Sequence, residues 1–361
     1  MLNISKLSFP GLGIGEFSVN SEAFEPIPGF PIAWYALIIT FGMVCAVAYT
    51  IFRANKIGIS IDDILDFVIF TIPIGIIGAR LYYVLAEIEK YSSLEEVFDI
   101  RKGGLAIYGG IIAGAITVLV VAWIKKINFF AMADCCTPGI ILAQSIGRWG
   151  NFTNGEAFGA EYDGFLRMGV QNNISFKTFG TSDMVFVHPT FLYESLWNLL
   201  GFILINIFYK KKKYDGQIML AVFGWYGFGR FFIEGLRTDS LWTGPFGVIS
   251  VIFAVVLLAA ILVFVYYIFD FISAVKSKTF SNKQKYLYLG LLGAAVVSVV
   301  MIVLDMLVIH SITVIPEQRV SQVLGAAIFL VCAGALTYLG IKKFEKPFYF
   351  KEATEKKKKE T

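Results

Sequence analysis

The sequence predicts an all-α polytopic membrane protein: a seven-helix core, two extra C-terminal transmembrane helices, and a small irregular or β-containing extracytoplasmic head. The chain has 361 residues, is 57% hydrophobic and has a mean hydropathy of +0.70. Charged residues make up 16%, whereas soluble proteins carry roughly 25%. These charges separate apolar runs of about 20 residues, the length that crosses a bilayer. The composition therefore excludes a water-soluble domain and a nucleic-acid-binding protein.

Nine apolar stretches are long enough to be spanning helices. They cover residues 32–52, 64–86, 104–124, 129–145, 190–209, 217–236, 246–269, 286–309 and 323–341. Two of the connecting segments are unusually long. We expect a helix along the membrane surface in 87–103. The segment at about 149–187 is rich in Gly, Asn, Thr and Phe and has little helical periodicity, which predicts the head.

Lysine and arginine concentrate in every second connecting loop, and short loops rich in these residues face the cytoplasm. The pattern places the N-terminus outside and the C-terminus inside. The predicted parts are an extracytoplasmic segment at 1–30, a transmembrane core at 31–270, a cytoplasmic linker at 271–285, an accessory transmembrane hairpin at 286–341 and a basic cytoplasmic tail at 342–361.

Six charged residues fall within or at the ends of apolar spans: Arg80, Asp134, Arg148, Glu194, Arg230 and Glu234. Each costs about 2.5–3.5 kcal/mol at the bilayer centre, so these groups must pair or line a hydrated cavity. The predicted topology places all except Asp134 in the outer half of the membrane. Tyr226, Arg230, Glu234 and Arg237 share one helical face because they are three or four residues apart. A purely structural Arg–Glu pair is the competing interpretation.

The segment 147–159 reads G-R-W-G-N-F-T-N-G-E-A-F-G and begins where an apolar helix reaches the outer surface. Its glycines allow turns and close ligand approach. Arg148 offers a planar fork suited to a phosphate, and Asn151, Asn154 and Glu156 add donors and acceptors. A polar helix end leading into a loop is the alternative. Four cysteines without ligand spacing and only two histidines predict no metal site.

This segment resembles the signature of the bacterial prolipoprotein diacylglyceryl transferase family, G-R-x-G-N-F-x-N-x-E-x-x-G, at every fixed position. Five further blocks stand in the family's order, and together they carry the resemblance over roughly residues 30–270. These blocks are 34–35, 78–83, 103–110, 188–194 and 226–234.

The resemblance implies a multi-pass enzyme of the bacterial cytoplasmic membrane whose active site faces outside. Such an enzyme moves the diacylglyceryl group of phosphatidylglycerol onto the lipobox cysteine thiol of a prolipoprotein, the first step of lipoprotein maturation. It forms a thioether and releases glycerol 1-phosphate. The expected partners are phosphatidylglycerol, prolipoprotein lipobox peptides and membrane lipid, with no cofactor and no nucleic acid. The oligomeric state is left open.

The resemblance also implies roles for individual residues. Arg148 and Arg230 would bind the phosphate and stabilise its charge. Asn151, Asn154 and Glu156 would position the head group or Arg148, while Glu234 would orient Arg230. Tyr35 would line the lipid pocket. The remaining substrate-binding candidates are Gly159, Tyr226 and Arg80.

The chain departs from the family's pattern at two places. Tyr108 stands where many members carry histidine, so it is expected as a catalytic hydrogen-bond donor rather than as a base, because a phenol has a pKa near 10. Thiol activation is left to the substrate phosphate or to arginine electrostatics, with His188 as a further candidate that is equally well explained as structural. The hairpin at 286–341 is the second departure, and we expect an accessory role for it.

Two other functions remain open at this point. A transporter or channel for an anionic solute would also place Arg and Glu inside the membrane, although no internal repeat is found and the polar groups do not continue through the inner half. A noncatalytic lipid-binding scaffold is the other alternative.

Overall fold

The computed structural model describes residues 4–88, 91, 93–99, 103–239, 292, 296–297 and 319–341. The chain divides into two compact units. The first unit comprises Met1–Thr50, Ala133–Ile252 and Ile302–Lys351, and the second comprises Ile51–Met132, Phe253–Met301 and Glu352–Thr361. Within the described residues, six helices are long and apolar enough to cross a membrane. The protein is therefore a mostly helical, multi-pass membrane protein.

The helices of the first unit are α1 (Trp34–Ala54, most of which belongs to this unit), α5 (Phe129–Asn154), α7 (Thr190–Phe208), α8 (Gln217–Leu236) and α13 (Val320–Ile341). All coincide closely with predicted spans except α5, which continues nine residues beyond 145. The first half of the 147–159 segment is therefore helical. The predicted spans 246–269 and 286–309 lie outside the described residues, apart from 292, 296 and 297, as do 271–285 and 342–361.

Glycine allows α1 and α5 to approach closely. A Cβ atom placed on Gly42 would lie 3.0 Å from the Ala143 carbonyl oxygen, and one on Gly139 would lie 2.8 Å from that of Ala46. Small residues at helix contacts let backbones approach in membranes, where packing replaces the hydrophobic drive.

Two tryptophans join α7 to α8. The rings of Trp197 and Trp225 stack with centroids 4.2 Å apart. Each indole N–H donates to the other residue's carbonyl, at 3.1 and 3.0 Å. The partly buried indole donors are thereby satisfied, and α8 is held in register with α7.

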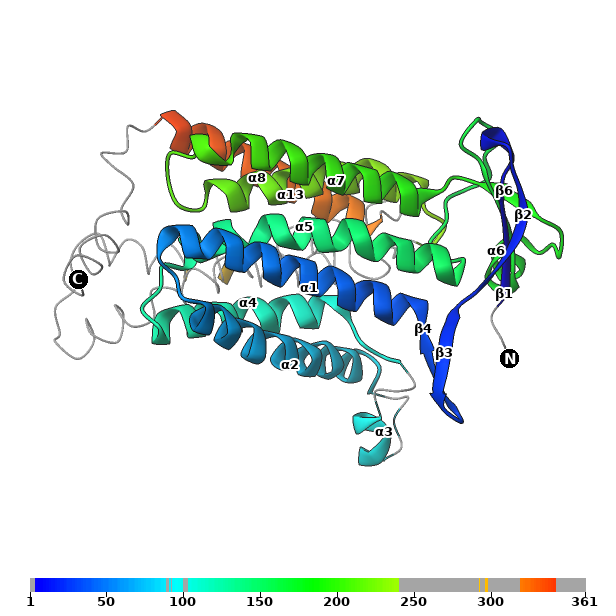
Figure 1. Ribbon diagram of the computed structural model, residues 1–361, viewed down its shortest axis with the longest axis horizontal. Helices are drawn as coiled ribbons and strands as arrows, with labels where there is room; N and C mark the ends of the chain where they lie inside the picture. Colours follow the sequence, from blue (N-terminus) through cyan, green and yellow to red (C-terminus); the bar gives the residue numbers. More distant parts are fainter. Residues whose placement is uncertain are drawn as a thin grey trace. The chain divides into compact units, whose positions relative to one another are not determined.

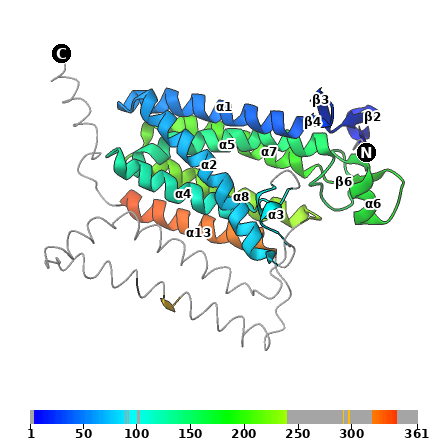
Figure 2. The same ribbon diagram turned by 90° about the horizontal axis from the view of Figure 1, so that it is seen from below.

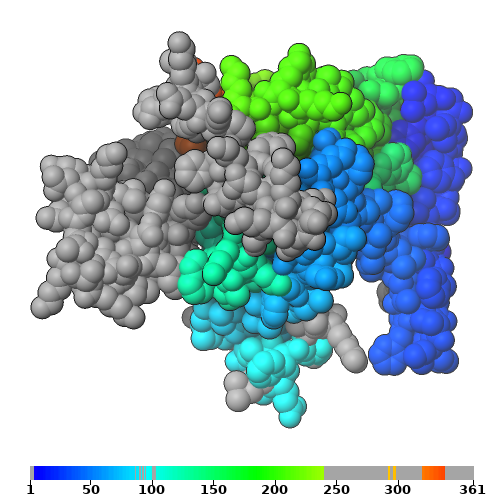
Figure 3. Space-filling view, turned by 60° about the vertical axis from the view of Figure 1, so that its left-hand side comes forward, coloured from blue at the N-terminus to red at the C-terminus, as the bar shows by residue number. Residues whose placement is uncertain are grey.

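The head contains a four-stranded antiparallel sheet in the order β2–β1–β5–β6. Its strands are β1 (Ile4–Phe9), β2 (Ile14–Asn20), β5 (Met168–Gln171) and β6 (Val185–Val187), with α6 (Asn173–Phe179) between the last two. The N-terminal segment thus supplies two of the four strands. In the ribbon and space-filling views, this dark-blue segment lies against the green residues of the head (Figures 1 and 3).

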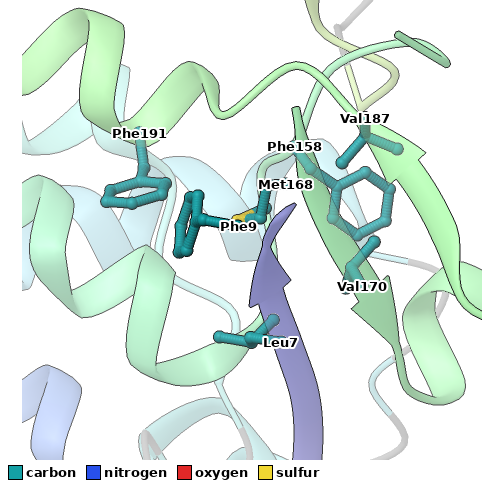
Figure 4. Packing of buried hydrophobic residues seen from close by; sticks show 7 residues of the cluster. All are labelled: Leu7, Phe9, Phe158, Met168, Val170, Val187 and Phe191. Atoms are coloured by element: carbon teal, nitrogen blue, oxygen red, sulfur yellow. The ribbon is translucent and has the colours of Figure 1, made fainter. Parts of the chain in front are cut away.

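A hydrophobic cluster holds the head together (Figure 4). It consists of Leu7, Phe9, Phe158, Met168, Val170, Val187 and Phe191. Phe158 belongs to the 147–159 segment and Phe191 to the first turn of α7. Phe152, on the last turn of α5, packs against the cluster with its ring 5.0 Å from that of Phe191. The cluster therefore fixes the segment against the start of α7. A separate hairpin, β3 (Glu22–Ile27) and β4 (Phe30–Ala33), leads into α1.

The second unit contains α2 (Ile61–Ala86), the short α3 (Leu94–Phe98) and α4 (Ile107–Ile124). Helices α2 and α4 lie side by side in both ribbon views (Figures 1 and 2). A Cβ atom on Gly109 would lie 2.3 Å from the Gly78 carbonyl oxygen, so only glycine fits at this contact. The predicted surface helix at 87–103 is reduced in the described residues to the five residues of α3.

Candidate functional site

A single buried carboxylate, that of Glu194 near the start of α7, gathers three arginines. Arg148 Nη2 on α5 lies 2.6 Å from Glu194 Oε1, and Arg230 Nη1 on α8 lies 3.0 Å from Oε2. Arg237, just beyond α8, places Nη1 3.9 Å from Oε2. The two predicted catalytic arginines therefore meet at one glutamate, at the end of the helices nearest the head.

The 147–159 segment adds a polar network to Arg148. Arg148 Nη1 donates to Asn151 Oδ1 at 3.1 Å. The amides of Asn151 and Asn154 both donate to Glu156 Oε1, at 3.1 and 3.0 Å. A helix carrying Arg at one position and Asn three residues later brings these side chains together. The network therefore orients one edge of the Arg148 guanidinium, and Glu194 orients the other.

The chain turns back sharply to bring Glu156 onto these amides. Gly155 has a φ of +60° and Ala157 a φ of +55°. The left-handed region is costly for a residue with a Cβ atom. At Ala157 the turn is held by the Thr190 hydroxyl, which donates to the Ala157 carbonyl oxygen. The turn thus depends on a contact with the first residue of α7.

On α8, Arg230 Nη2 lies 2.6 Å from Glu234 Oε2, one helical turn away. Arg230 consequently lies between two glutamates. Tyr226 lies one turn earlier on the same face of α8. The predicted face of α8 therefore points toward the cluster.

Exposure differs between the acids and the bases. The side chains of Glu194 and Glu234 are 4% and 2% exposed, while those of Arg148 and Arg230 are 22% and 15% exposed. Among the described residues, Arg148 uses two of its five N–H donors. Guanidinium groups held by buried carboxylates, with donors to spare, can bind an incoming anion such as phosphate.

Two predicted site residues take part through close packing. A Cβ atom on Gly150 would lie 2.7 Å from Cδ2 of Tyr35, so the Tyr35 ring lies directly on the α5 backbone beside Arg148. A Cβ atom on Gly159 would lie 2.6 Å from His188 Cβ and 2.8 Å from the Leu236 carbonyl oxygen. Gly159 therefore allows the segment to pass between the start of α7 and the end of α8.

His188 and Asp239 border the cluster outside the spanning helices. The His188 ring stacks on Tyr162 with centroids 3.9 Å apart, and Nδ1 lies 3.3 Å from the Tyr193 hydroxyl. Burial lowers the pKa of His188, so the ring is neutral near pH 7. Burial alone would raise the pKa of Asp239, but the hydrogen bonds and charge of Arg237 hold that pKa below its ordinary value.

An apolar groove of about 540 Å³ runs between α1, α5 and α7 in the first unit. Its lining includes Trp34, Phe41, Leu142, Trp149 and Leu199, with the Ser145 and Ser195 hydroxyls as polar members. Trp149 follows Arg148 in the chain and Ser195 follows Glu194. The groove therefore lies beside the charged cluster and offers an apolar surface next to it.

Two predicted site residues belong to the second unit. Arg80 donates to five backbone carbonyls, those of Glu96, Val97, Asp99, Gly103 and Gly104, at 2.7–3.1 Å. All five of its N–H donors are thus engaged within that unit. Tyr108 lies in the first turn of α4.

Asp134, predicted apart from the other charges, lies near the opposite end of α5 from Arg148. Its carboxylate accepts from Lys212 Nζ at 3.0 Å and from the backbone N–H groups of Gly216 and Met219 at 2.9 and 2.8 Å. It thereby satisfies N–H donors that the start of α8 leaves unpaired. No group of three or more His, Cys, Asp or Glu side chains that could hold a metal occurs among the described residues.

The sequence analysis places Glu194 among the charges that must pair and Arg237 on the shared face of α8, but it predicts neither the central position of Glu194 nor a contact of Arg237 or Arg319 with the site. The signals for the first two are the charge of Glu194 inside an apolar span and the position of Arg237 three residues beyond Glu234 on the same face. Arg319, whose Nη1 donates to the Glu234 carbonyl oxygen, belongs to no motif.

Comparisons with known proteins identify the family to which the chain is similar. The sequence model of the family described as prolipoprotein diacylglyceryl transferase matches residues 22–267. Relatives named phosphatidylglycerol–prolipoprotein diacylglyceryl transferase include one from Clostridioides difficile, 43% identical over 66% of this chain and 92% of the relative. One from Listeria monocytogenes is 42% identical over 71% and 92%, and one from Streptococcus pneumoniae is 48% identical over 58% and 80%. This chain belongs to the prolipoprotein diacylglyceryl transferase family of enzymes.

Proposed function

We propose that this chain transfers the diacylglyceryl group of phosphatidylglycerol to the lipobox cysteine thiol of prolipoproteins, forming a thioether and releasing glycerol 1-phosphate. The observation that carries the proposal is the convergence of Arg148 and Arg230 on Glu194 beside the segment 147–159. The family to which the chain belongs indicates the reaction class. The arginines of the cluster can stabilise the negative charge of a departing phosphate.

The site works at the outer face of the bacterial cytoplasmic membrane. Glu194 lies near the start of α7, whereas Lys210, Lys211, Lys212 and Lys213 follow its end. Positively charged loops remain in the cytoplasm, so the opposite end of α7 belongs outside. A thiol on a translocated prolipoprotein can reach a site in that position.

Arg148 and Arg230 bind the phosphodiester of the lipid. Each guanidinium is already oriented by buried carboxylates, so little conformational freedom is lost when a phosphate arrives. Asn151, Asn154 and Glu156 hold Arg148 in position, and Glu234 holds Arg230. Preorganised donors aimed at developing charge stabilise a transition state more than mobile donors do.

In the reaction, the thiol sulfur attacks the glycerol carbon that carries the phosphate ester. The C–S bond forms as the C–O bond breaks, and the electron pair leaves on the phosphate oxygen of glycerol 1-phosphate. The thiol proton passes to the phosphate of the donor. A cysteine thiol has a pKa near 8.5, and the positive field of the two arginines lowers the cost of forming the thiolate. His188 is occupied by its ring stack and is not required as a base.

The acyl chains of the donor occupy the groove between α1, α5 and α7, where Trp149 and Trp34 line the wall. Apolar chains bound there keep the phosphate beside Arg148, because that residue and Trp149 are neighbours in the chain. Tyr35 packs on Gly150, and its neighbour Trp34 lines the groove.

The test uses purified protein in phosphatidylglycerol-containing detergent micelles with a lipobox peptide. We expect a peptide whose mass increases by one diacylglyceryl group and an equal amount of released glycerol phosphate. A peptide with serine in place of the lipobox cysteine is the control and should remain unmodified. Lipid binding without product would support a noncatalytic scaffold instead. Anionic solute flux in proteoliposomes without peptide modification would support a transporter.

A further inference from the structure

Helix α13 lies outside the family match, which ends at residue 267, yet it packs along the helix that carries Arg230 and Glu234. Gln322, Gly325, Phe329 and Cys332 are three or four residues apart and form one face of α13. Gln322 Nε2 donates to the Phe231 carbonyl at 3.0 Å, and the Phe329 ring lies 5.1 Å from that of Phe228. Residue numbers rise along α13 as they fall along α8, so the helices are antiparallel.

The closest contact lies one turn from the arginine. A Cβ atom on Gly325 would lie 2.7 Å from the Gly227 carbonyl oxygen, 3.1 Å from the Phe231 nitrogen and 3.4 Å from Arg230 Cβ. A Cβ atom on Gly227 would lie 2.6 Å from the Gly325 carbonyl oxygen. The two backbones therefore touch where the Arg230 side chain leaves α8.

The last turn of α8 is also held from this side. Arg319, the residue before α13, donates from Nη1 to the Glu234 carbonyl oxygen. The same carbonyl also accepts the Arg237 backbone N–H at 3.2 Å, and a cation at the C-terminal end of a helix is favoured by the helix dipole. Glu234, which binds Arg230 through its side chain, is thus fixed through its backbone by Arg319.

We propose that α13 is a positioning element of the active site, in which Gly325 sets the distance between α8 and α13 while Arg319 and Gln322 fix the end of α8 that presents Arg230 and Glu234. This role differs from the accessory one expected for the hairpin at 286–341. It rests on the proposed function, since the positioned groups are those that bind the lipid phosphate.

The functional test compares two glycine-to-alanine changes on the same helix. Gly325→Ala forces the helices apart, whereas a Cβ atom on Gly334 meets no heavy atom of the described residues within 4 Å. Both changes replace a helical glycine, so both gain the same helix propensity. We expect Gly325→Ala to lower kcat/KM about tenfold or more, since misplacement of a binding group by 1 Å can cost about 100-fold. Gly334→Ala should match the parent.

Equal activity of these two variants would overturn the proposal. Arg319 supplies a second readout: Arg319→Ala should lower kcat and Arg319→Lys should restore part of it, because a cation returns to the Glu234 carbonyl. Equal loss in both Arg319 variants would also count against the proposal, as would full activity of both.

A cross-link tests the packing without any activity. A Cβ atom on Gly224 would lie 3.3 Å from Cys332 Cβ. In disulfides the two Cβ atoms are about 3.5–4.5 Å apart. Oxidation of Gly224→Cys membranes should therefore remove two thiols from maleimide labelling of the denatured chain. The control keeps Gly224→Cys but moves the partner thiol by one residue. It carries Cys332→Ala and Val331→Cys, because Val331 is 65% exposed. That chain should keep both thiols.

The outcomes separate the two proposals. A Gly224→Cys variant that cross-links, together with a parent chain that never modifies the peptide, would refute the proposed function and leave the helix contact intact. An active parent whose Gly224→Cys variant does not cross-link, or whose Gly325→Ala variant equals Gly334→Ala, would refute the positioning role alone.

Discussion

Arg148 and Arg230, 82 residues apart in the chain, bind opposite oxygens of one carboxylate, that of Glu194. The glutamate is almost fully buried and both guanidinium groups are partly exposed. Glu194 therefore holds two positive charges close together that would otherwise repel each other, and it does so from the side away from solvent.

Glu194→Gln should lower transferase kcat/KM by roughly 10–100-fold, because charge-assisted hydrogen bonds to the arginines contribute about 1.5–3 kcal/mol. The glutamine keeps the shape but presents an N–H group to one guanidinium. The measurement is the initial rate at several phosphatidylglycerol concentrations. Glu16→Gln, on an exposed strand of the head, is the matched control. Undiminished turnover in a folded Glu194→Gln protein would show that the shared carboxylate is dispensable.

Arg148→Ala and Arg230→Ala should each abolish detectable transfer while the chain still inserts into the membrane, because each change removes a phosphate partner. Arg148→Lys and Arg230→Lys retain the charge but lose the planar fork, so we expect weak activity with a raised KM for phosphatidylglycerol. Membrane-fraction yield reports insertion. Near-parental rates in either alanine variant would contradict the assignment.

The depth of the charged cluster in the membrane could be predicted from the sequence. Inserting a charge within an apolar span costs free energy, so such charges must find partners. On that basis the sequence predicts one level for Arg80, Arg148, Glu194, Arg230 and Glu234. The structure joins the last four by ion pairs, whereas Arg80 is engaged by backbone carbonyls of the second unit. The sharing of Glu194 could not be predicted, since helical spacing shows which residues share a face of one helix and not which faces meet.

The head illustrates the same limit. Its β content was expected from the irregular segment 149–187, but β1 pairs with β5 across more than 160 residues. No local pattern connects residues 4–9 with 168–171. The nine-residue extension of α5 was also missed, because Gly147, Gly150 and the asparagines favour a turn locally, whereas packing of Phe152 in the head stabilises the helix.

Gly150→Ala should impair the enzyme more than Gly147→Ala, although both lie on α5 within the same motif. A Cβ atom on Gly150 would lie 2.7 Å from the Tyr35 ring, while one on Gly147 would meet Ile39 Cγ1 at an ordinary 3.9 Å. We expect the first change to displace Tyr35 and lower kcat/KM about tenfold. Rates and thermal stability of the two purified variants decide the matter, and equal behaviour would argue against close Tyr35 packing.

The stability of the head should fall in mild acid because of His188. Burial lowers the pKa of this ring in the folded chain, so the unfolded chain binds a proton first as the pH drops through about 6.5. Stability is therefore fully present above that pH and declines below it, until the folded ring also becomes protonated. Unfolding midpoints measured from pH 7.5 to 5 should show this slope, and His188→Phe, which keeps the ring stack, should flatten it. An unchanged slope in the variant would assign the effect to other groups.

Tyr108→Phe should reduce the transfer rate by about 3–10-fold, the effect of one lost hydrogen bond of about 0.5–1.5 kcal/mol. The expectation rests on the place of Tyr108 at the start of α4, where the resemblance to the family puts a histidine in many members. Tyr108→His restores a hydrogen-bond donor and should recover most of the rate. If the substrate phosphate accepts the thiol proton, the pH–rate profile of Tyr108→His will match that of the parent. A new limb near pH 6.5 would instead show that a base at residue 108 can activate the thiol, and an unchanged rate in Tyr108→Phe would reduce this tyrosine to a packing role.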